Sequence, residues 1–337
     1  MSSSLGHVLL GDIGATNARF AMLANGLLGP VVTFEAAKFA RFDDVVAVLL
    51  KDPYRKATIS LALFAVAGPV EDERSALTNC SWIIDAHELR KRFNLDVRVL
   101  NDFEATAHSL PALMAADLFR IGGGQARTGA SMVVLGPGTG LGVAGLCPNS
   151  DGPIAITSEG GHATLAATCD REEAILNHLR CRFGHVSAER AISGEGLENL
   201  YQAIVELDRI DIASRNAAEI TKNALGGCPT ATAALEMFCS FLGAFAGNVA
   251  LTFAARGGVY IAGGIAPRIV DFIARSEFRR RFEAKGRFRA YLELIPSHVI
   301  VHPAATLLGL KALVERCPAP VVALTGMRRS SRASSPV

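Results

Sequence analysis

The residues best suited to chemistry are polar side chains that fall in separate short segments. Asn101-Asp102 follows an apolar run, Glu159 and His162 flank two glycines in SEGGH, and Glu189 lies in GHVSAER. Carboxylates, amides and imidazoles exchange hydrogen bonds with hydroxyl groups, and a sugar needs several of them together. Taken singly, each is better explained as a solvated surface residue. As a converging set, they predict a sugar site. The candidates are Asn79, Asn101, Asp102, Glu159, His162 and Glu189.

A glycine turn near the N-terminus is a candidate phosphate site. It comprises Gly11, Asp12, Ile13, Gly14, Ala15 and Thr16, and it joins two short apolar runs. Successive backbone N–H groups in such a turn form a nest for anions, and Asp12 beside it could hold Mg²⁺ through water. An ordinary hairpin with an aspartate in its turn explains these residues equally well. The segment is neither a P-loop nor a G-x-G-x-x-G motif before a helix.

Two later glycine segments lie in comparable settings. Gly138, Thr139 and Gly140 belong to the turn GPGTGLG between two apolar runs, and Gly263-Gly264 follows a third run. Packed glycines let the backbone approach a neighbour closely or adopt a positive φ. Taken alone, Gly263-Gly264 is better explained as a plain strand-to-helix turn. The two loops in matching settings nevertheless predict a nucleotide held between two halves of the chain.

Apolar runs and helical periodicity place these residues on alternating strands and helices. We expect strands at 7–11, 18–23, 57–66, 97–100, 132–135, 141–146 and 258–262. We expect helices at 42–51, 85–93, 103–110, 171–183, 196–207 and 231–255, and another from 267. Asp85 is a suitable N-cap, with Glu88 at the capping-box spacing. Asn101-Asp102 falls at the carboxyl end of a strand, where ligands collect in open α/β sheets.

The arrangement of strand, glycine turn and returning strand occurs twice in the chain. The first copy covers residues 7–23 and the second covers 132–146. As a sequence repeat it is degenerate. It predicts an α/β fold with two related halves that face each other.

The amino-acid composition limits the classes of protein to which this chain can belong. With 337 residues, half of them hydrophobic, the chain is long enough for two domains. A formal net charge of +2 excludes a strongly basic nucleic-acid binder. Seven cysteines without a C-x-x-C pair indicate reduced thiols in a cytosolic protein, each best explained as a small buried side chain. The basic cluster Arg279-Arg280-Arg281, with Lys285, Arg287 and Arg289, is best explained as a solvated helix face.

Three further segments bear on whether the protein is exported, spans a membrane or has a disordered end. The N-terminus lacks the charged and apolar regions of a signal peptide. Residues 238–255 are uncharged and long enough to span a bilayer, but Ser240, Asn248 and many small residues favour a buried helix. We therefore expect no membrane contact. The Ser/Arg-rich segment 325–337 is expected to be disordered.

Six motifs together resemble those of one family. They are GDIGATNARF, NDFEATAHSLP, LGPGTGLGVA, SEGGHATLA, GHVSAERAISGEGLENLY and GGVYIAGGIAPR. In this order and at this spacing, over residues 7–316, they resemble the bacterial ATP-dependent glucokinases, which belong to the actin-like sugar-kinase superfold. The resemblance implies two actin-like (ribonuclease H-like) α/β domains hinged about a central cleft. The small domain would comprise 1–112 plus 303–324, and the large domain 113–302.

The resemblance also implies an activity and its residues. It implies cytoplasmic phosphorylation of glucose at the 6-hydroxyl by ATP with Mg²⁺, which feeds glycolysis, and a homodimer is the default assembly. Asp102 corresponds to the catalytic aspartate. The other substrate-binding residues would be Asn79, Asn101, Gly138, Glu159, His162 and Glu189. The nucleotide would contact 11–16, Gly138, Thr139, Gly140, Gly263 and Gly264. No residue is assigned as a direct metal ligand.

One departure and three alternatives accompany the resemblance. Ala15 stands where the family usually has glycine, so nucleotide affinity could differ if that position needed a positive φ. The zinc-containing branch of the superfold carries a cysteine cluster after the Glu-Gly-Gly-His block, whereas residues 163–170 contain only Cys169. A kinase for another sugar, or one that uses polyphosphate, remains open. So does a non-catalytic sugar-sensing regulator, although no DNA-binding module precedes the first motif.

Overall fold

The structure is a computed structural model, and it describes residues 7–52, 54, 57–77 and 80–316. Its N-terminal part is built on a sheet in the order β3-β2-β1-β5-β8, with β4 beside β2. The strands are β1 (His7–Ile13), β2 (Asn17–Ala24), β3 (Leu27–Leu28), β4 (Val32–Glu35), β5 (Ile59–Val66) and β8 (Asp96–Asn101). The helices α1 (Phe42–Lys51) and α2 (Ala86–Phe93) belong to this part, and β6 (Arg74–Ala76) pairs with β7 (Ile83–Asp85).

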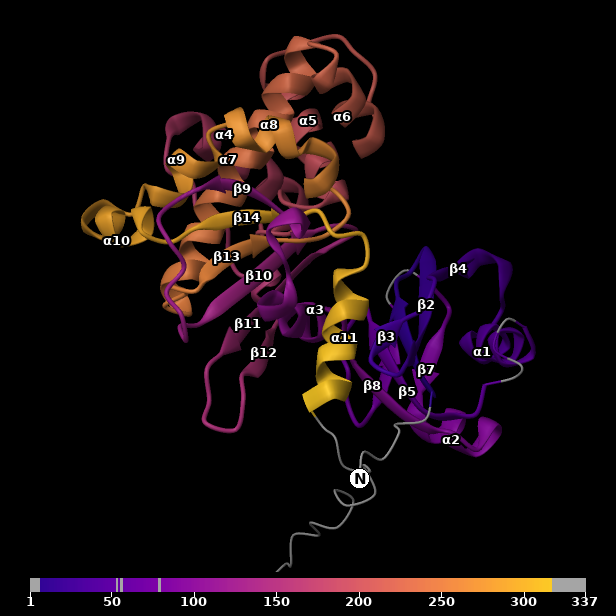
Figure 1. Ribbon diagram of the computed structural model, residues 1–337. Coiled ribbons are helices and arrows are strands. Elements are labelled where there is room, and N and C mark those ends of the chain that lie inside the picture. Colours follow the sequence, from indigo (N-terminus) through magenta and orange to yellow (C-terminus); the bar gives the residue numbers. More distant parts are fainter. Residues whose placement is uncertain (1–6, 53, 55–56, 78–79, 317–337) are drawn as a thin grey trace, which may run out of the picture.

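The second part of the chain is built on another sheet, in the order β12-β11-β10-β13-β14-β9. Its strands are β9 (Leu118–Gly122), β10 (Met132–Pro137), β11 (Leu141–Cys147), β12 (Ile154–Ser158), β13 (Gly258–Ile261) and β14 (Ser297–Ile300). Its helices are α4 (Asp170–Phe183), α5 (Gly194–Leu207), α6 (Ala217–Leu225), α7 (Pro229–Thr252), α8 (Val270–Arg275), α9 (Phe278–Glu283) and α10 (Arg289–Glu293). Figure 1 shows the two sheets in separate lobes.

The two sheets repeat one topology, which confirms the predicted duplication of the hairpin. In the first sheet β1 pairs antiparallel with β2 and parallel with β5, and β5 pairs parallel with β8. In the second sheet β10 pairs antiparallel with β11 and parallel with β13, and β13 pairs parallel with β14. In both halves, therefore, the carboxyl ends of three parallel strands lie along one edge of the sheet.

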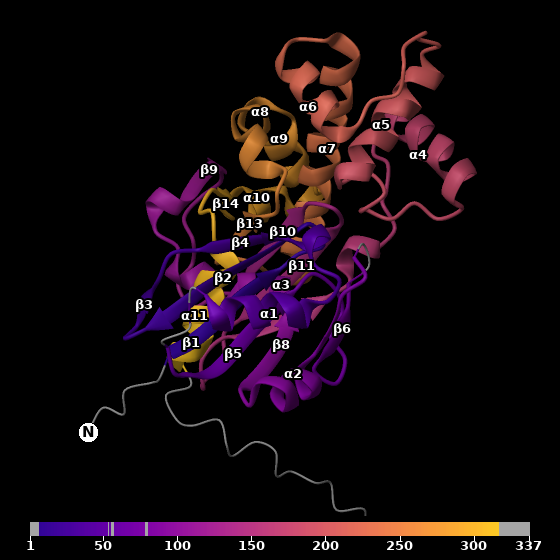
Figure 2. The same ribbon diagram turned by 90° about the vertical axis from the view of Figure 1, so that its right-hand side faces the viewer.

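Two helices cross between the lobes (Figures 1 and 2). α3 (Asp102–Ser109) leaves the first sheet after β8, but Ala107 packs with buried residues of the second sheet, such as Val134 and Ala144. α11 (Ala305–Arg316) leaves the second sheet after β14, but Leu307 and Leu310 pack on the first sheet. One face of the first sheet is thus covered by α11, which follows a strand of the second sheet. One face of the second sheet is covered by α3, which follows a strand of the first sheet. The opposite faces are covered by α1 and α2 in the first lobe, and by helices that include α5 and α7 in the second.

Most predicted elements lie where the patterns placed them. The helix at 42–51 is α1, and Asp85 caps α2 by accepting hydrogen bonds from the N–H groups of His87 and Glu88. The first strand differs, because it continues to Ile13 instead of ending at 11. Asp12 pairs with Arg19, and Ile13 pairs with both Ala18 and Val66. The ladder therefore shortens the first glycine turn to residues 14–16.

The apolar helix α7 is a core element of the second lobe. It is long and apolar enough to cross a membrane by length and composition, and most of its apolar window is buried inside the protein. Phe238, Phe241 and Leu242 have no exposed surface. The prediction of a buried helix is therefore confirmed.

Two predictions about exposure are wrong in part. Arg280, Arg287 and Arg289 are exposed, as the predicted solvated face requires. Arg279 and Arg281 are not on a solvated helix face, because their side chains are only 16% and 10% exposed. Arg279 pairs with Glu283 and Arg281 pairs with Glu172, so α9 uses these charges for packing. Among the cysteines of the described residues, only Cys239 is buried, while Cys169 and Cys181 are exposed. Periodicity and composition do not reveal which face of a charged helix packs against other elements of the same chain.

Candidate active site

The glycine segments lie at the carboxyl ends of strands. Ile13, Val66 and Asn101 are level across β1, β5 and β8, so the first turn and Asp102 leave the same edge of the first sheet. In the second sheet, the Ile265 N–H donates to the carbonyl of Pro137 at 3.3 Å. The second glycine turn and Gly263-Gly264 are therefore direct neighbours. This is the sheet edge at which ligands bind in α/β folds.

Gly263 is needed at its position for conformational and steric reasons. Its φ is +83°, in the left-handed region, and a Cβ there would overlap the carbonyl oxygen of Pro137. Gly264 has no atom within 4 Å of the place where a Cβ would stand. Bare backbone therefore borders open space beside the second turn, as a nucleotide site requires.

The first turn presents less backbone than predicted. Gly11 is buried within β1, where a Cβ would lie 2.7 Å from the ring of Phe64, so its role is in packing. The Gly14 N–H is engaged by the carbonyl of Asn17 at 3.0 Å. Ala15 is absent from the described residues with a positive φ. Alanine therefore fits this turn without backbone strain, and Ala15 and Thr16 have the solvent access that a ligand needs.

Asn101 is first of all the N-cap of α3. Its Oδ1 accepts the N–H groups of Phe103 at 2.9 Å and Glu104 at 3.2 Å, and its Nδ2 donates to the carbonyl of Gly68 at 3.0 Å. Both ends of the amide thus bind backbone, and they fix where α3 begins. The sequence patterns predicted the helix but missed this cap.

Asp102 occupies the first position of α3, half-buried beside the two phosphate-type turns. Burial, together with the negative charges of Asp12 and Glu159, raises the pKa of Asp102 to about 7, although a hydrogen bond from the Phe103 N–H opposes the rise. A carboxyl group with this pKa exchanges a proton readily near neutral pH. Such tuning is typical of a general base.

Asp12 and Asp102 together make a site that suits a divalent cation. Burial raises the pKa of the Asp12 carboxyl, and Arg19, whose Nη1 lies 3.5 Å from Oδ2, only partly opposes the rise. The negative charge of Asp12 also disfavours ionisation of Asp102, so a positive charge bound between them would favour the charged form of both carboxyl groups. Mg²⁺ prefers oxygen ligands and keeps its waters beside phosphates, so the residues present fit it.

The predicted sugar residues of the second lobe form one cluster. His162 lies 3.9 Å from Glu159 through Nε2 and 3.9 Å from Glu189 through Nδ1. Glu189 Oε2 also accepts the N–H of Leu141 at 2.9 Å, which ties this carboxylate to the end of the second glycine turn. The side chains of Glu159 and His162 are 69% and 60% exposed, so they are available to a ligand.

Sequence reasoning missed the residues that hold Glu189 in place. Ser193 Oγ donates to the carbonyl of Glu189 at 2.8 Å, and the Gly194 N–H donates to the carbonyl of Gly138 at 2.8 Å. Ser193 is 2% exposed and caps α5 through the N–H of Gly196. The spacing Ser-Gly-x-Gly before a helical pattern was the available signal, since serine is a preferred N-cap.

The structure brings together most of the predicted site residues. Asp12 and Glu159 act electrostatically on Asp102, Glu159 and Glu189 flank His162, and Glu189 contacts the second turn. Asn79 lies outside the described residues, so its proposed contact has no structural account. The arrangement combines a tuned carboxyl group, two backbone turns and a polar cluster, which suits phosphoryl transfer to a polyol.

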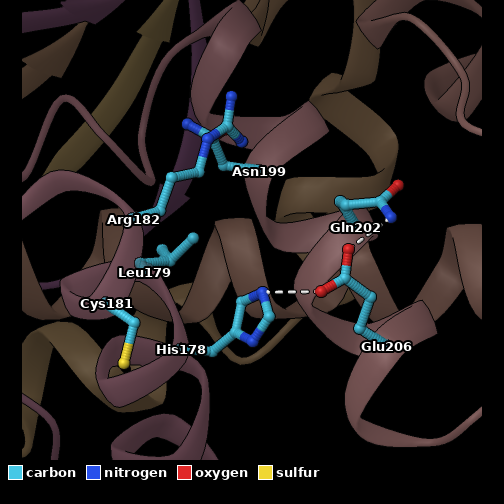
Figure 3. A pocket seen from close by; sticks show the side chains of 7 residues that line it. All are labelled: His178, Leu179, Cys181, Arg182, Asn199, Gln202 and Glu206. Carbon is cyan, nitrogen blue, oxygen red and sulfur yellow. Dashed lines mark hydrogen bonds and ion pairs between the residues drawn. The ribbon is translucent and has the colours of Figure 1, made fainter.

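A hollow elsewhere on the second lobe has a different character. It lies between α4 and α5, and its polar side chains already bind one another. His178 Nε2 lies 3.1 Å from Glu206 Oε2, while Gln202 donates to Glu206 Oε1 at 2.7 Å (Figure 3). No unpaired buried group points to a ligand in it. The glycine turns and Asp102 therefore remain the candidate active site.

Comparison with known proteins decides the family. A family model described as Glucokinase matches residues 9–317. The chain belongs to the glucokinase family. It is 42% identical over 313 residues to a glucokinase of Paramagnetospirillum magneticum, covering 91% of this chain and 97% of that one. It is also 42% identical over 312 residues to the Bifunctional protein glk of Paraburkholderia xenovorans, covering 92% of this chain and 49% of that protein.

The family's fold agrees with the architecture described above. A crystal structure of glucokinase from an Antarctic psychrotroph matches with a TM-score of 0.82 and 34% identity, covering 92% of this chain and 99% of that chain. The predicted two-domain actin-like fold is therefore confirmed. The chain spans about half the length of the bifunctional relatives that it matches, because it covers 48–49% of them.

Proposed function

We propose that this protein is a cytoplasmic glucokinase that transfers the γ-phosphoryl group of ATP to the 6-hydroxyl of glucose, giving glucose 6-phosphate and ADP for glycolysis. Membership of the glucokinase family supports the reaction. The single observation that carries it in this structure is Asp102. It is a carboxyl group with a pKa near 7, placed at a strand end beside two glycine turns.

In this proposal each half of the chain has a task. Asp102 accepts or orients the proton of the 6-hydroxyl, and Glu159, His162 and Glu189 bind the other sugar hydroxyls together with Asn101 and Asn79. The backbone of 14–16 and of Gly138, Thr139 and Gly140 faces the phosphates, and Gly263-Gly264 borders the adenosine. When bound with ATP, Mg²⁺ would be held beside Asp12 through water and would neutralise charge on the phosphoryl group.

The domain limits are part of the same proposal. We place 1–112 with 303–324 in the small domain and 113–302 in the large domain, and the assembly as a homodimer. The packing of α11 on β1 and β5 supports the first assignment as far as residue 316. Residues 317–324, and the tail 325–337, lie outside the described residues. Sedimentation of the purified protein would test the dimer.

The test of the function is a coupled assay for ADP release. Glucose, mannose, fructose and N-acetyl sugars are compared as acceptors, with ATP and polyphosphate as donors. We expect glucose and ATP to give the highest kcat/KM. A higher value for another pair would contradict the substrate assignment and favour the corresponding sugar kinase.

Two substitutions test the base directly. Asp102→Asn and Asp102→Ala should lower kcat by about 10²–10⁴-fold, the usual worth of a general base or orienting group. The matched control is Asp151→Asn, an exposed aspartate in the turn before β12. Folded Asp102 variants with kcat close to that of the wild type would show that Asp102 is not the base.

A non-catalytic regulator is not favoured by any observation. Its sequence support was the basic cluster, and Arg279 donates there to the carbonyls of Ile295 and Leu292 as well as to Glu283. The guanidinium groups of Arg279 and Arg281 are thus used within the fold. A sugar kinase therefore remains the function that the candidate site supports best.

A further inference from the structure

Phe103, the residue after Asp102, contacts the strands that carry the second glycine turn. It belongs to the first turn of α3, and its N–H is accepted by Asn101 Oδ1 and Asp102 Oδ1, both at 2.9 Å. Its ring packs beside the core cluster of the second lobe that includes Val134 and Ala144. The backbone of this residue is thus tied to the candidate base, and its side chain to the other lobe.

The ring occupies space that two glycines leave free. A Cβ at Gly136 would lie 2.7 Å from Cζ of Phe103, and a Cβ at Gly142 would overlap Cδ2 and Cε2. Gly136 and Gly142 pair directly across β10 and β11. They therefore bracket the turn of Gly138, Thr139 and Gly140. Contact this close is possible only because neither strand carries a side chain there.

The same contact reaches the third glycine segment. The Cβ position of Gly136 that faces Phe103 is also 2.9 Å from the N atom of Gly263. Asp102, Phe103, the second turn and Gly263-Gly264 thus form one continuous packed column. A shift of the ring would alter the distance between the candidate base and both backbone segments expected to border the nucleotide.

We propose that Phe103 is a positioning residue, whose ring sets the place of Asp102 relative to the second phosphate turn. This inference rests on the proposed phosphoryl transfer. The reacting hydroxyl is placed by Asp102 and the phosphoryl group by the turn, so their separation decides whether transfer occurs. Misplacement by about 1 Å costs up to about 10²-fold in such reactions.

The plain alternative is that Phe103 only fills space in the core. It is half-buried and lies at the margin of its cluster. A space-filling role predicts lower thermal stability with unchanged kcat in the protein that remains folded. A positioning role predicts a lower kcat with little change in the KM for glucose, because Glu159, His162 and Glu189 lie outside this contact.

The experiment is a double-mutant cycle on Phe103 and Gly142. We expect Phe103→Ala to lower kcat by about 10- to 100-fold, and Phe103→Leu to retain an intermediate value. Gly142→Ala should have a similar effect on kcat, because its new Cβ pushes the ring away from β11. Combined with Phe103→Ala, the Gly142→Ala change should cause almost no further loss, since the ring that it displaces is gone.

Gly145→Ala is the matched control. Gly145 lies on the same strand, and a Cβ there would lie 2.5 Å from the ring of Phe253, which packs against a different core cluster from Phe103. The control has a comparable clash and should lose thermal stability while keeping its kcat. Losses of kcat that multiply in the Phe103/Gly142 cycle, or an equal loss in Gly145→Ala, would overturn the inference.

The proposed function and this inference fail in different ways. If the wild type prefers another sugar, the assignment to glucose fails, but the cycle is measured with that sugar and keeps its meaning. If the wild type transfers no phosphoryl group at all, the distance from the Asp102 carboxyl group to the backbone of Gly138–Gly140, measured in crystal structures, replaces kcat. That distance should change in Phe103→Ala and Gly142→Ala but not in Gly145→Ala, and an unchanged distance in the first two would overturn the inference.

Discussion

At the scale of single residues, Asp102 owes its properties to its surroundings more than to its type. Its carboxyl group lies at the N-terminus of α3 and accepts a backbone N–H, which alone would favour the charged form. Burial and the charges of Asp12 and Glu159 outweigh this and raise its pKa to about 7. The carboxyl group can therefore accept a proton at neutral pH. Its raised pKa depends on neighbouring residues from both lobes.

The pH dependence of activity should report this environment. Because the base acts as a carboxylate, kcat/KM should fall as the pH decreases through about 7. Removing a negative neighbour stabilises the carboxylate, so Asp12→Asn and Glu159→Gln should move this acid limb to lower pH. Asp12 is the stronger influence, so its shift should be the larger. The measurement is kcat/KM against pH at subsaturating ATP.

The control for this profile is Glu195→Gln, which removes an exposed carboxylate paired with Arg190. Its acid limb should coincide with that of the wild type. If the limbs of all four proteins coincide, the titrating group is not Asp102.

At the scale of elements, the contact between α3 and α11 links the two lobes. Thr106 Oγ1 donates to the carbonyl of Asp102 at 2.8 Å and lies 3.1 Å from Thr306 Oγ1 on α11. Gly309 lies against the backbone of α3, where a Cβ would overlap the carbonyl oxygen of Ala105. The helix that begins with the candidate base is thus held by the C-terminal helix at very short range.

Replacing Gly309 by alanine tests this contact. Intrinsic propensity favours alanine over glycine inside a helix by about 1 kcal/mol. The overlap with Ala105 should outweigh this gain, because an extra methyl group in a packed contact costs about 1–3 kcal/mol. We therefore expect Gly309→Ala to lower the free energy of unfolding, measured by urea denaturation.

Lys311→Ala is the comparison for this substitution. It lies two residues further along α11, and its ion pair with Glu315 has a long distance of 3.7 Å. Such a pair contributes about 0–1 kcal/mol, so stability should barely change. Equal or higher stability of Gly309→Ala would show that the two helices separate without cost.

At the scale of the whole molecule, the candidate site is divided between two lobes. Asp12, Asn101 and Asp102 come from the first sheet and its edge, while Glu159, His162 and Glu189 come from the second lobe. In this structure the side chains of Glu159 and His162 are mostly exposed. Transfer to a sugar must exclude water, which would otherwise accept the phosphoryl group.

We therefore expect glucose to bring the lobes together. Small-angle scattering should show a smaller radius of gyration with glucose than without it, because the sugar contacts groups on both sides. L-Glucose, which has the same composition and the wrong handedness, is the control ligand. An unchanged radius at a glucose concentration that calorimetry shows to be saturating would contradict closure.

Patterns along the chain predict where the candidate site residues lie in the fold better than they predict what these residues contact. The apolar run 97–100 is a local feature that predicts a strand with Asn101-Asp102 at its carboxyl end. The structure has β8 there. The same patterns do not predict the N-cap by Asn101. Its partners are backbone N–H groups, which take their positions only once the first turn of α3 has formed. The glycine pattern predicts that Gly11 belongs to a phosphate turn, yet Phe64 and Phe20 from neighbouring strands make it a packing residue. For Gly11, residues on neighbouring strands made the difference, whereas the Asn101 cap depends on the N–H groups of Phe103 and Glu104 close by in the sequence.

Sequence patterns predict seven strands that belong to the two sheets, most of the longer helices, the repeated hairpin and the family. These depend on periodicity, turn residues and motif order, which act over a few neighbouring residues. The tertiary structure alone decided that Glu189 binds the N–H of Leu141, that Arg281 is buried against Glu172, and that Phe103 lies between Gly136 and Gly142. Packing brings these partners together from distant segments, and the pKa of Asp102 follows from the same packing because burial and neighbouring charge exist only in the folded chain.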